Sequence, residues 1–208
     1  VGQITVDDVM DEVREQSERD YQLASGLSQD VETDDNVFRQ TTARLPWLII
    51  GMLGGIGNSM ILGNFDATFA AHPEMALYIP LIGGTGGNVG TQSSALIVQG
   101  LANSSLDSKN TLKQVAKEAV VALINATIIS LLVYTYNFIR FGAMATVTYS
   151  VSISLFAVVM FASIFGTLVP MTLERLKIDP AIATGPFIAI TNDIIGMMLY
   201  MGITVLLS

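Results

Sequence analysis

PLIGGTGGNVGTQSS, residues 80–94, lies inside an apolar segment, and five of the eight residues from Gly83 to Gly90 are glycine. Asn88 and Gln92 lie among and beside these glycines. Polar and irregular backbone is costly in hydrocarbon unless it is buried in protein or lines a water-filled cavity. The stretch therefore predicts a helix inside a membrane protein, where the glycines serve either close packing or a pore wall.

The composition of the whole chain also indicates a membrane protein. Of the 208 residues, 51% are hydrophobic and 13% are charged, whereas soluble domains carry about 25% charged residues. The mean hydropathy is +0.55. The sequence has no cysteine, which excludes disulfides and thiolate metal sites. The N-terminus lacks the basic start and apolar run of a signal peptide, so no cleaved targeting segment is expected.

Five mostly apolar runs after position 44 have the length of about 20 residues that spans a bilayer core. We therefore predict an all-α membrane protein with five transmembrane helices per protomer. The runs cover residues 45–65, 75–102, 115–139, 145–173 and 181–207. The last run follows Pro180, a residue suited to the first turn of a helix.

The Lys and Arg residues predict the orientation, because they favour the cytoplasmic side of a membrane. With five spans and a cytoplasmic N-terminus, seven of the eight basic residues after position 38 lie inside and only Arg140 lies outside. The opposite orientation inverts this ratio, and a four-span interpretation removes the bias. We predict a multi-pass protein of the inner or plasma membrane with its N-terminus in the cytoplasm.

The net charge of −8 belongs mainly to residues 1–35, which contain eleven of the eighteen acidic residues. The apolar spacing within residues 4–27 predicts a solvated, amphipathic helix, which Asp7 or Asp8 is able to cap. Residues 28–42 are polar and acidic, and they leave room for a helix that reaches the membrane. One face of the helix predicted within residues 4–27 is acidic and consists of Asp7, Asp8, Asp11, Glu12, Glu15 and Glu18. This face is either simply exposed to water, or it binds a divalent cation that reduces the repulsion between its carboxylates.

Asp193 is the one acidic residue that we place near the middle of a span, in GPFIAITNDIIGMMLY. A carboxylate at this depth costs several kcal/mol unless it is paired, hydrated or protonated, so it indicates a functional site. The alternative is an acid that holds helices together by hydrogen bonds. At about 1.5 Å per residue, Asp193 lies about 18 Å into span five and Asn88 about 20 Å into span two. Both positions are near the midplane.

Residue spacing places the polar groups on helix faces. Asn88 and Gln92 are four residues apart. Gly185, Ala189 and Asp193 follow one another at intervals of four residues. Each set therefore shares a face of its predicted helix. A stripe of small residues that leads to a carboxylate exposes backbone carbonyls and leaves space for water. Ordinary packing of small residues four apart also explains the glycines, but it does not explain the two amides.

The donor set favours a hard cation. Carboxylate, amide and carbonyl oxygens without thiolate or intramembrane histidine suit Mg²⁺ or Ca²⁺, and anions are disfavoured because no span interior contains Lys or Arg. Mg²⁺ keeps its waters, so a roomy lining around a hydrated ion fits it better than a tight cage. One carboxylate per chain is little for a divalent ion, which predicts a homodimer with two Asp193 side chains near a two-fold axis.

Other polar residues have more ordinary interpretations. Asn58, Asn64 and Asn125 are interpreted as hydrogen-bonding contacts between helices. His72 lies in an outer loop near Asp66 and Glu74, where a solvated face is a simpler interpretation than a metal site.

The motifs resemble those of the MgtE magnesium channels. The residues that carry the resemblance are PLIGGTGGNVGTQSSALIVQGLA (80–102), DPAIATGPFIAITNDIIGMMLY (179–200) and ARLPWLIIGML (43–53). It covers essentially the whole chain. It implies that residues 1–27 are the end of a second cytosolic CBS domain, residues 28–44 a connecting, plug-like helix, and residues 45–208 the five-helix pore domain.

The resemblance also implies a homodimeric, Mg²⁺-selective channel in which the acid at Asp193 binds a hydrated ion. The backbone around Ala189 lies nearby, and Asn88 contributes to the pore. In full-length members, Mg²⁺ bound among acidic cytosolic surfaces closes the pore through the connecting helix. The metal site is thus predicted at Asp193, Ala189 and Asn88, with a pore lining of Gly84, Gly87, Gln92 and Gly185.

We therefore expect a channel that conducts Mg²⁺ down its electrochemical gradient, with Mg²⁺ as cargo and as a candidate regulatory ligand. Neither enzymatic turnover nor a nucleic-acid partner is expected; the partners are lipid, Mg²⁺ and a second copy of the chain. The alternative is a transporter coupled to Na⁺ or H⁺ that uses the same carboxylate. An intramembrane aspartyl hydrolase would need two adjacent acids, and a non-transporting assembly subunit is a further class.

Overall fold

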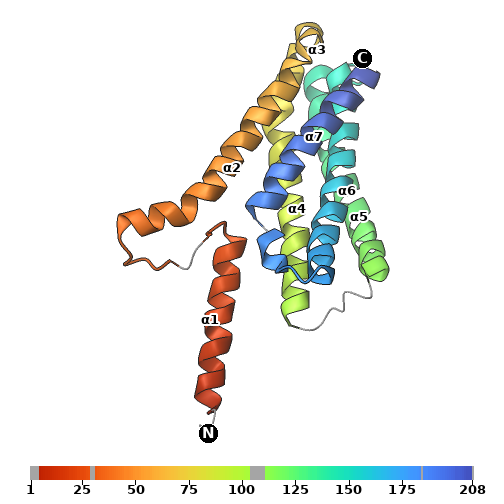
Figure 1. The fold of residues 1–208 in the computed structure, drawn as a ribbon. Helices are drawn as coiled ribbons and strands as arrows, with labels where there is room; N and C mark the ends of the chain where they lie inside the picture. Colours follow the sequence, from red (N-terminus) through yellow and green to blue (C-terminus); the bar gives the residue numbers. More distant parts are fainter. Residues whose placement is uncertain (1–4, 29–30, 104–110, 184, 208) are drawn as a thin grey trace.

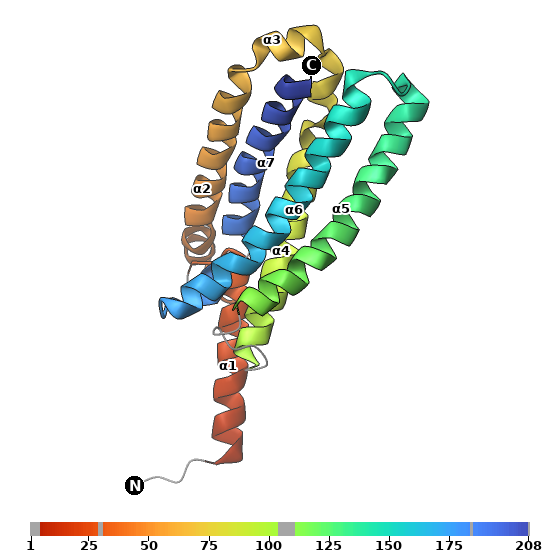
Figure 2. The ribbon, with the colours of Figure 1, turned by 90° about the vertical axis from the view of Figure 1, so that its right-hand side faces the viewer.

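The computed structural model describes residues 5–28, 31–103, 111–183 and 185–207, and every regular element in these ranges is helical. Figures 1 and 2 show long helices running side by side above a separate N-terminal helix. The elements are α1 (Val6–Ala24), α2 (Val37–Gly63), α3 (Asp66–Ala71), η1 (Pro73–Tyr78), α4 (Ile79–Ala102), α5 (Thr111–Phe141), α6 (Thr146–Arg175), η3 (Pro180–Ala183) and α7 (Pro186–Leu207).

Helix α6 forms the centre of the bundle, since it packs against α4, α5 and α7. The core includes Leu155, Val158 and Val159 of this helix, together with residues of α4 and α7 such as Ile82 and Tyr200. Helix α2 joins the bundle mainly through α7. Figure 1 shows the first part of α2 turning away from the other helices.

Four described helices are long and apolar enough to cross a membrane, namely α2, α5, α6 and α7. Helix α4 carries the glycine-rich stretch and is not among them. Its 24 residues correspond to about 36 Å at 1.5 Å per residue, so its length is sufficient. Its glycines, amides and hydroxyls dilute its apolar character, and six of its eight buried residues are glycine or serine. The helical membrane fold is confirmed, whereas the count of five spans stays a prediction.

Two predicted spans begin later than expected. The second span was placed from residue 75, but residues Pro73–Tyr78 form a 3₁₀ turn and α4 begins at Ile79. The fifth was placed from residue 181, but Pro180 begins another 3₁₀ turn and α7 begins at Pro186. In both places apolar residues continue through a turn that contains proline, so hydropathy alone did not mark the helix boundary.

The predicted connecting helix over residues 28–44 is not a separate element in this structure. Residues 31–36 are not helical, and α2 continues without interruption from Val37 to Gly63. The Asn36 side chain accepts a hydrogen bond from the Arg39 N–H and so caps this helix. Pro46 lies inside α2, and a proline there removes a backbone hydrogen bond and favours a bend.

The N-terminal helix α1 is solvated as predicted, because none of its residues is buried. It begins at a capping box in which Thr5 and Asp8 exchange hydrogen bonds. The CBS-domain end implied for residues 1–27 begins with residues 1–4, which lie outside the described residues. The end of α1 lies against the start of α7, where a Cβ at Gly26 would lie 2.6 Å from Pro186 Cγ.

Candidate functional site

A cavity of about 370 Å³ lies between α2, α4 and α7. It brings together five of the seven residues that the sequence predicted for the site. The residues that matter to its chemistry are Asn58 from α2, Gly83, Gly84, Gly87, Asn88 and Thr91 from α4, and Ala189 and Asp193 from α7.

The carboxylate of Asp193 lies directly over the glycines of α4. A Cβ built on Gly83 would lie 3.3 Å from Asp193 Oδ1, and one built on Gly87 would lie 3.5 Å from the same atom. A larger side chain at either position would occupy the space beside the carboxylate. The glycines therefore have a specific function here, since they let an acid on one helix approach the backbone of another.

Asp193 is half-buried, and among the described residues no group donates a hydrogen bond to it or forms an ion pair with it. An acid near the middle of an apolar helix needs water, a proton or a cation when the protein supplies no partner. The interpretation of Asp193 as a contact that merely holds helices together lacks the hydrogen bond that it requires. The carboxylate faces the cavity instead.

Asn58 lies on α2, the third helix that borders the cavity. The sequence analysis did not predict that this residue belongs to the site. We interpreted it as a hydrogen-bonding contact between helices, but its Oδ1 is buried without a hydrogen-bond partner among the described residues. Asn58 lines the same cavity as Asp193. A polar residue in the run GGIGNSM was the only available signal, and it could not show which helix α2 would face.

Two predicted lining residues lie elsewhere. Gln92 lines a different cavity, between α4 and α5. Gly185 precedes α7 and has a φ of +51°, and a Cβ at this position would overlap the carbonyl oxygen of Ala24. The four-residue spacing from Gly185 to Ala189 does not define a shared helix face, because Gly185 is not part of the helix.

The cavity is not built to grip a bare metal ion. No group of three or more His, Cys, Asp or Glu side chains in the described part of the chain is placed to hold one. The available groups are one carboxylate and the neutral oxygens of Asn58, Asn88 and Thr91. Such a set can contact the waters of a hydrated cation by hydrogen bonds, which suits Mg²⁺ because it gives up its waters reluctantly.

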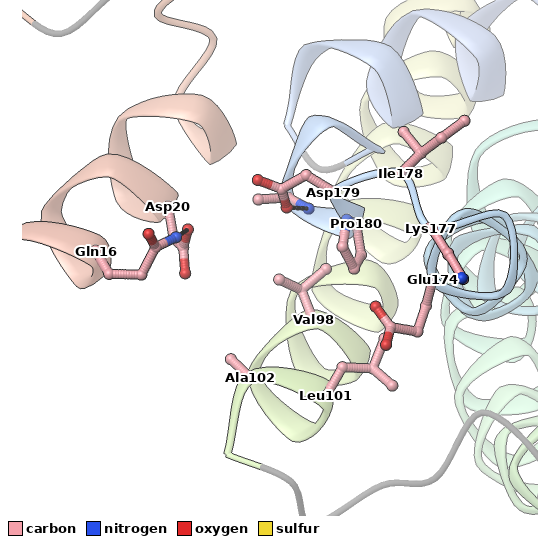
Figure 3. Close-up of a pocket in the computed structure, with 11 residues that line it drawn as sticks. Gln16, Asp20, Val98, Leu101, Ala102, Glu174, Lys177, Ile178, Asp179 and Pro180 are labelled. Carbon is pink, nitrogen blue, oxygen red and sulfur yellow. Dashed lines mark hydrogen bonds between the residues drawn. The ribbon is translucent and has the colours of Figure 1, made fainter. Parts of the chain in front are cut away.

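A second cavity, of about 400 Å³, lies between α1, the end of α4, and the segment that joins α6 to η3. Figure 3 shows Gln16 and Asp20 of α1 facing Asp179 and Pro180 across this space. Asp179 Oδ1 accepts a hydrogen bond of 2.9 Å from the Ala181 N–H. Acidic groups from α1 and from the bundle therefore line the same space, together with Lys177.

Residues 79–203 match the model of the MgtE family, described as a divalent cation transporter. The chain belongs to the MgtE family. The match runs from the first residue of α4 to within a few residues of the end of α7, so it includes both the glycine-rich stretch and Asp193. The MgtE resemblance of the sequence motifs is confirmed.

Three curated MgtE proteins extend the match to nearly the whole chain, and each is named magnesium transporter MgtE. The protein of Bacillus subtilis (strain 168) is 32% identical over 203 residues, which cover 98% of this chain and 45% of that protein. The protein of Thermus thermophilus is 32% identical over 213 residues, which cover 100% of this chain and 46% of that protein. The protein of Enterococcus faecalis is 28% identical over 209 residues, which cover 98% of this chain and 44% of that protein. This chain spans about half the length of these MgtE relatives.

Proposed function

We propose that this chain is the membrane part of a homodimeric channel that conducts Mg²⁺ down its electrochemical gradient. The observation that carries the proposal is the half-buried Asp193 carboxylate, which has no partner among the described residues and faces a cavity between three helices. The names of the relatives support Mg²⁺ as the cargo. Conduction needs only that the ion enters, is held weakly and leaves.

The chemistry of the cavity favours a hydrated ion. A single carboxylate offers too little charge to strip Mg²⁺ of its waters, whereas carboxylate and amide oxygens accept hydrogen bonds from a hydration shell. Ala189 lies beside Asp193 without filling the space, and Asn88 and Asn58 add neutral oxygens. Discrimination from larger ions then follows from the size of the hydrated complex that fits between the helices.

In this proposal a second protomer supplies the second negative charge that a divalent ion needs. Two chains related by a two-fold axis bring two Asp193 side chains to one path, which matches the charge of a divalent ion. Helix α4 serves as the fifth span, because four of its six glycines and both of its serines are buried against the other helices. The bias of Lys and Arg then places the N-terminus in the cytoplasm.

Regulation by cytosolic Mg²⁺ is the second part of the proposal. We interpret residues 1–27 as the end of a CBS domain and residues 28–44 as the connection to the pore. The acids Asp20, Glu174 and Asp179 line the cavity in Figure 3 together with one basic residue, Lys177. A divalent cation in this space would hold α1 against the bundle.

The test is Mg²⁺ uptake into liposomes that contain the purified chain, with Asp193→Asn as the variant. We expect uptake to fall by at least about tenfold, since one lost charge interaction of about 1.4 kcal/mol changes a rate by that factor. Asp34→Asn is the matched control, because Asp34 is exposed and lies before α2. Its uptake should equal that of the unchanged chain.

The same liposomes separate a channel from a coupled transporter. Uptake driven by a Mg²⁺ gradient alone should persist when ionophores remove the Na⁺ and H⁺ gradients. Full uptake by Asp193→Asn at normal protein levels would refute the proposed site, and uptake that stops without a Na⁺ or H⁺ gradient would refute the channel mechanism.

A further inference from the structure

A third cavity, of about 530 Å³, lies in a groove between α4 and α5 whose floor is formed by α6. Helices α4 and α5 both pack extensively on α6 but make few contacts with each other. Buried polar residues form the base of the groove, and exposed amide side chains line its rim. The base consists of Ser93, Glu118 and Ser163, and the rim includes Gln92, Gln99 and Asn125.

Glu118 is the chemically distinctive group in this groove. Its side chain belongs to α5, and the residue is only 9% exposed. Its Oε1 accepts hydrogen bonds from the Ser93 hydroxyl at 2.7 Å and from the Ser163 hydroxyl at 2.5 Å. In both contacts Oε1 of Glu118 is the acceptor. Its other oxygen, Oε2, receives no hydrogen bond from any described residue.

The charge of this carboxylate has no partner within the described chain. No Lys, Arg or His forms an ion pair with Glu118 there. The neighbouring Lys117 is exposed and lies at the rim of the groove. A buried charge without a counter-charge is strongly unfavourable, and the serine hydroxyls, being neutral, do not remove it. None of the described side chains supplies the compensating charge.

We propose that the groove binds one monovalent hard cation, Na⁺ or K⁺, at Oε2 of Glu118. Carboxylate, hydroxyl and amide oxygens are hard ligands of the kind that alkali cations prefer. One positive charge neutralises the single carboxylate, whereas Mg²⁺ would leave an unbalanced positive charge in a buried site beside Lys117. The bound cation also holds α5 to α4 and α6 through the Glu118 contacts with the two serines.

This site is separate from the Asp193 cavity and does not depend on the proposed function. Ser93 follows Asn88 by five residues on α4, which separates them by about 7.5 Å along the helix and by about 140° around it. The two residues line different cavities. The groove therefore offers a cation site on the face of α4 that points away from the predicted magnesium path.

The test is the thermal unfolding midpoint of the full chain in detergent, measured as NaCl or KCl replaces N-methyl-D-glucamine chloride. Constant ionic strength keeps general screening the same. We expect the midpoint to rise with the logarithm of the cation concentration, by about 3–6 °C when the cation reaches about ten times its dissociation constant. Glu118→Gln keeps the shape and acceptor oxygen of the side chain but removes its charge, and it should abolish the rise.

Three controls make the result specific. Glu174→Gln changes an exposed acid at the end of α6 and should keep the full rise, as should Asp193→Asn. Should Glu118→Gln fail to fold, broadening of the ²³Na NMR line by the unchanged chain, reversed by K⁺, reports the site without a variant. No rise with either salt, an equal rise in Glu118→Gln, or loss of the rise in Asp193→Asn would each overturn the proposal.

Discussion

At the scale of single residues, the distance between a carboxylate and a helix backbone decides the character of the site. Asp193 Oδ1 approaches α4 closely because positions 83 and 87 have no side chain. The same two glycines would look like simple packing residues if only their four-residue spacing were known. Here the neighbours on α7 include Asp193 and, for Gly87, also Ala189, so the glycines leave space beside a carboxylate.

The Gly87→Ala variant tests this role of the glycines. The added methyl group would lie 3.5 Å from Asp193 Oδ1 and 3.7 Å from Ala189 Cβ, which are ordinary contact distances. We therefore expect the thermal midpoint to change by less than about 2 °C, while Mg²⁺ uptake falls several-fold because the methyl group displaces water beside the carboxylate. Gly202→Ala, with nothing within 4 Å of the added group, is the matched control. Unchanged uptake in Gly87→Ala would show that this face of α4 does not border the ion path.

Which residues form the site was predictable only in part. Asp193, Ala189, Asn88, Gly84 and Gly87 were named from the sequence because an acid and a glycine run inside apolar helices are strong signals, and the structure brings them to one cavity. Their functional roles stay predictions. Asn58 was assigned to a different role, since a lone amide carries no information about its neighbours.

At the scale of helices, close contact between α4 and α6 sets the framework for both cavities on α4. A Cβ on Gly166 would overlap the carbonyl oxygen of Gly90 and lie 3.1 Å from its carbonyl carbon. The backbones of the two helices therefore touch at this point. Asn192 of α7 packs against the same residue, Gly90, so three helices meet here.

Gly166→Ala should separate these helices and destabilise the bundle. Overpacking of a well-packed site costs about 1–3 kcal/mol, which corresponds to a fall of about 2–12 °C in the thermal midpoint of a chain of this size. A scanning fluorimetry experiment on the purified protein measures the fall. Gly57→Ala meets no atom within 4 Å and should leave the midpoint unchanged. Equal midpoints for the two variants would mean that α4 and α6 do not make this contact.

The capping box of α1 gives a prediction about pH. The hydrogen bond from the Thr5 hydroxyl, followed by that from the Thr5 N–H, lowers the pKa of the Asp8 carboxyl. Because the folded pKa is depressed, the cap contributes fully above about pH 4, the ordinary value for Asp, and is lost as the pH falls through the lowered pKa. The ¹H–¹⁵N resonance of Thr5 should move over that acid range, and it should stay constant in Asp8→Asn. A Thr5 resonance that does not titrate would contradict the capping box.

Helix identity was easier to predict from the sequence than helix boundaries. All five apolar runs correspond to helices, because a run of this length in a membrane has little alternative to helix. The boundaries at Ile79 and Pro186 were missed because 3₁₀ turns with apolar residues precede both helices. Glu118 was overlooked as a buried group because it lies near the charged start of α5, where hydropathy gives no indication of burial.

At the scale of the whole molecule, polar groups are concentrated in cavities on two faces of α4, while α2 and α5 present mainly apolar surfaces outward. Figure 2 shows α2 and α5 at opposite sides of the bundle, with α4, α6 and α7 between them. The arrangement keeps the glycine-rich helix away from the periphery. In a chain of about half the length of its relatives, residues of α2, α4 and α7 surround the cavity at Asp193.

The central claim is that Asp193 binds a hydrated divalent cation, and anomalous X-ray scattering from crystals grown with Mn²⁺ tests it most directly. We predict an anomalous peak facing the Asp193 carboxylate in the cavity between α2, α4 and α7, with at least one water between metal and carboxylate. The peak should weaken as Mg²⁺ is added and should be absent from Asp193→Asn crystals. Cation density confined to other parts of the molecule, with the cavity empty and the Asp193 side chain turned toward lipid, would contradict the account.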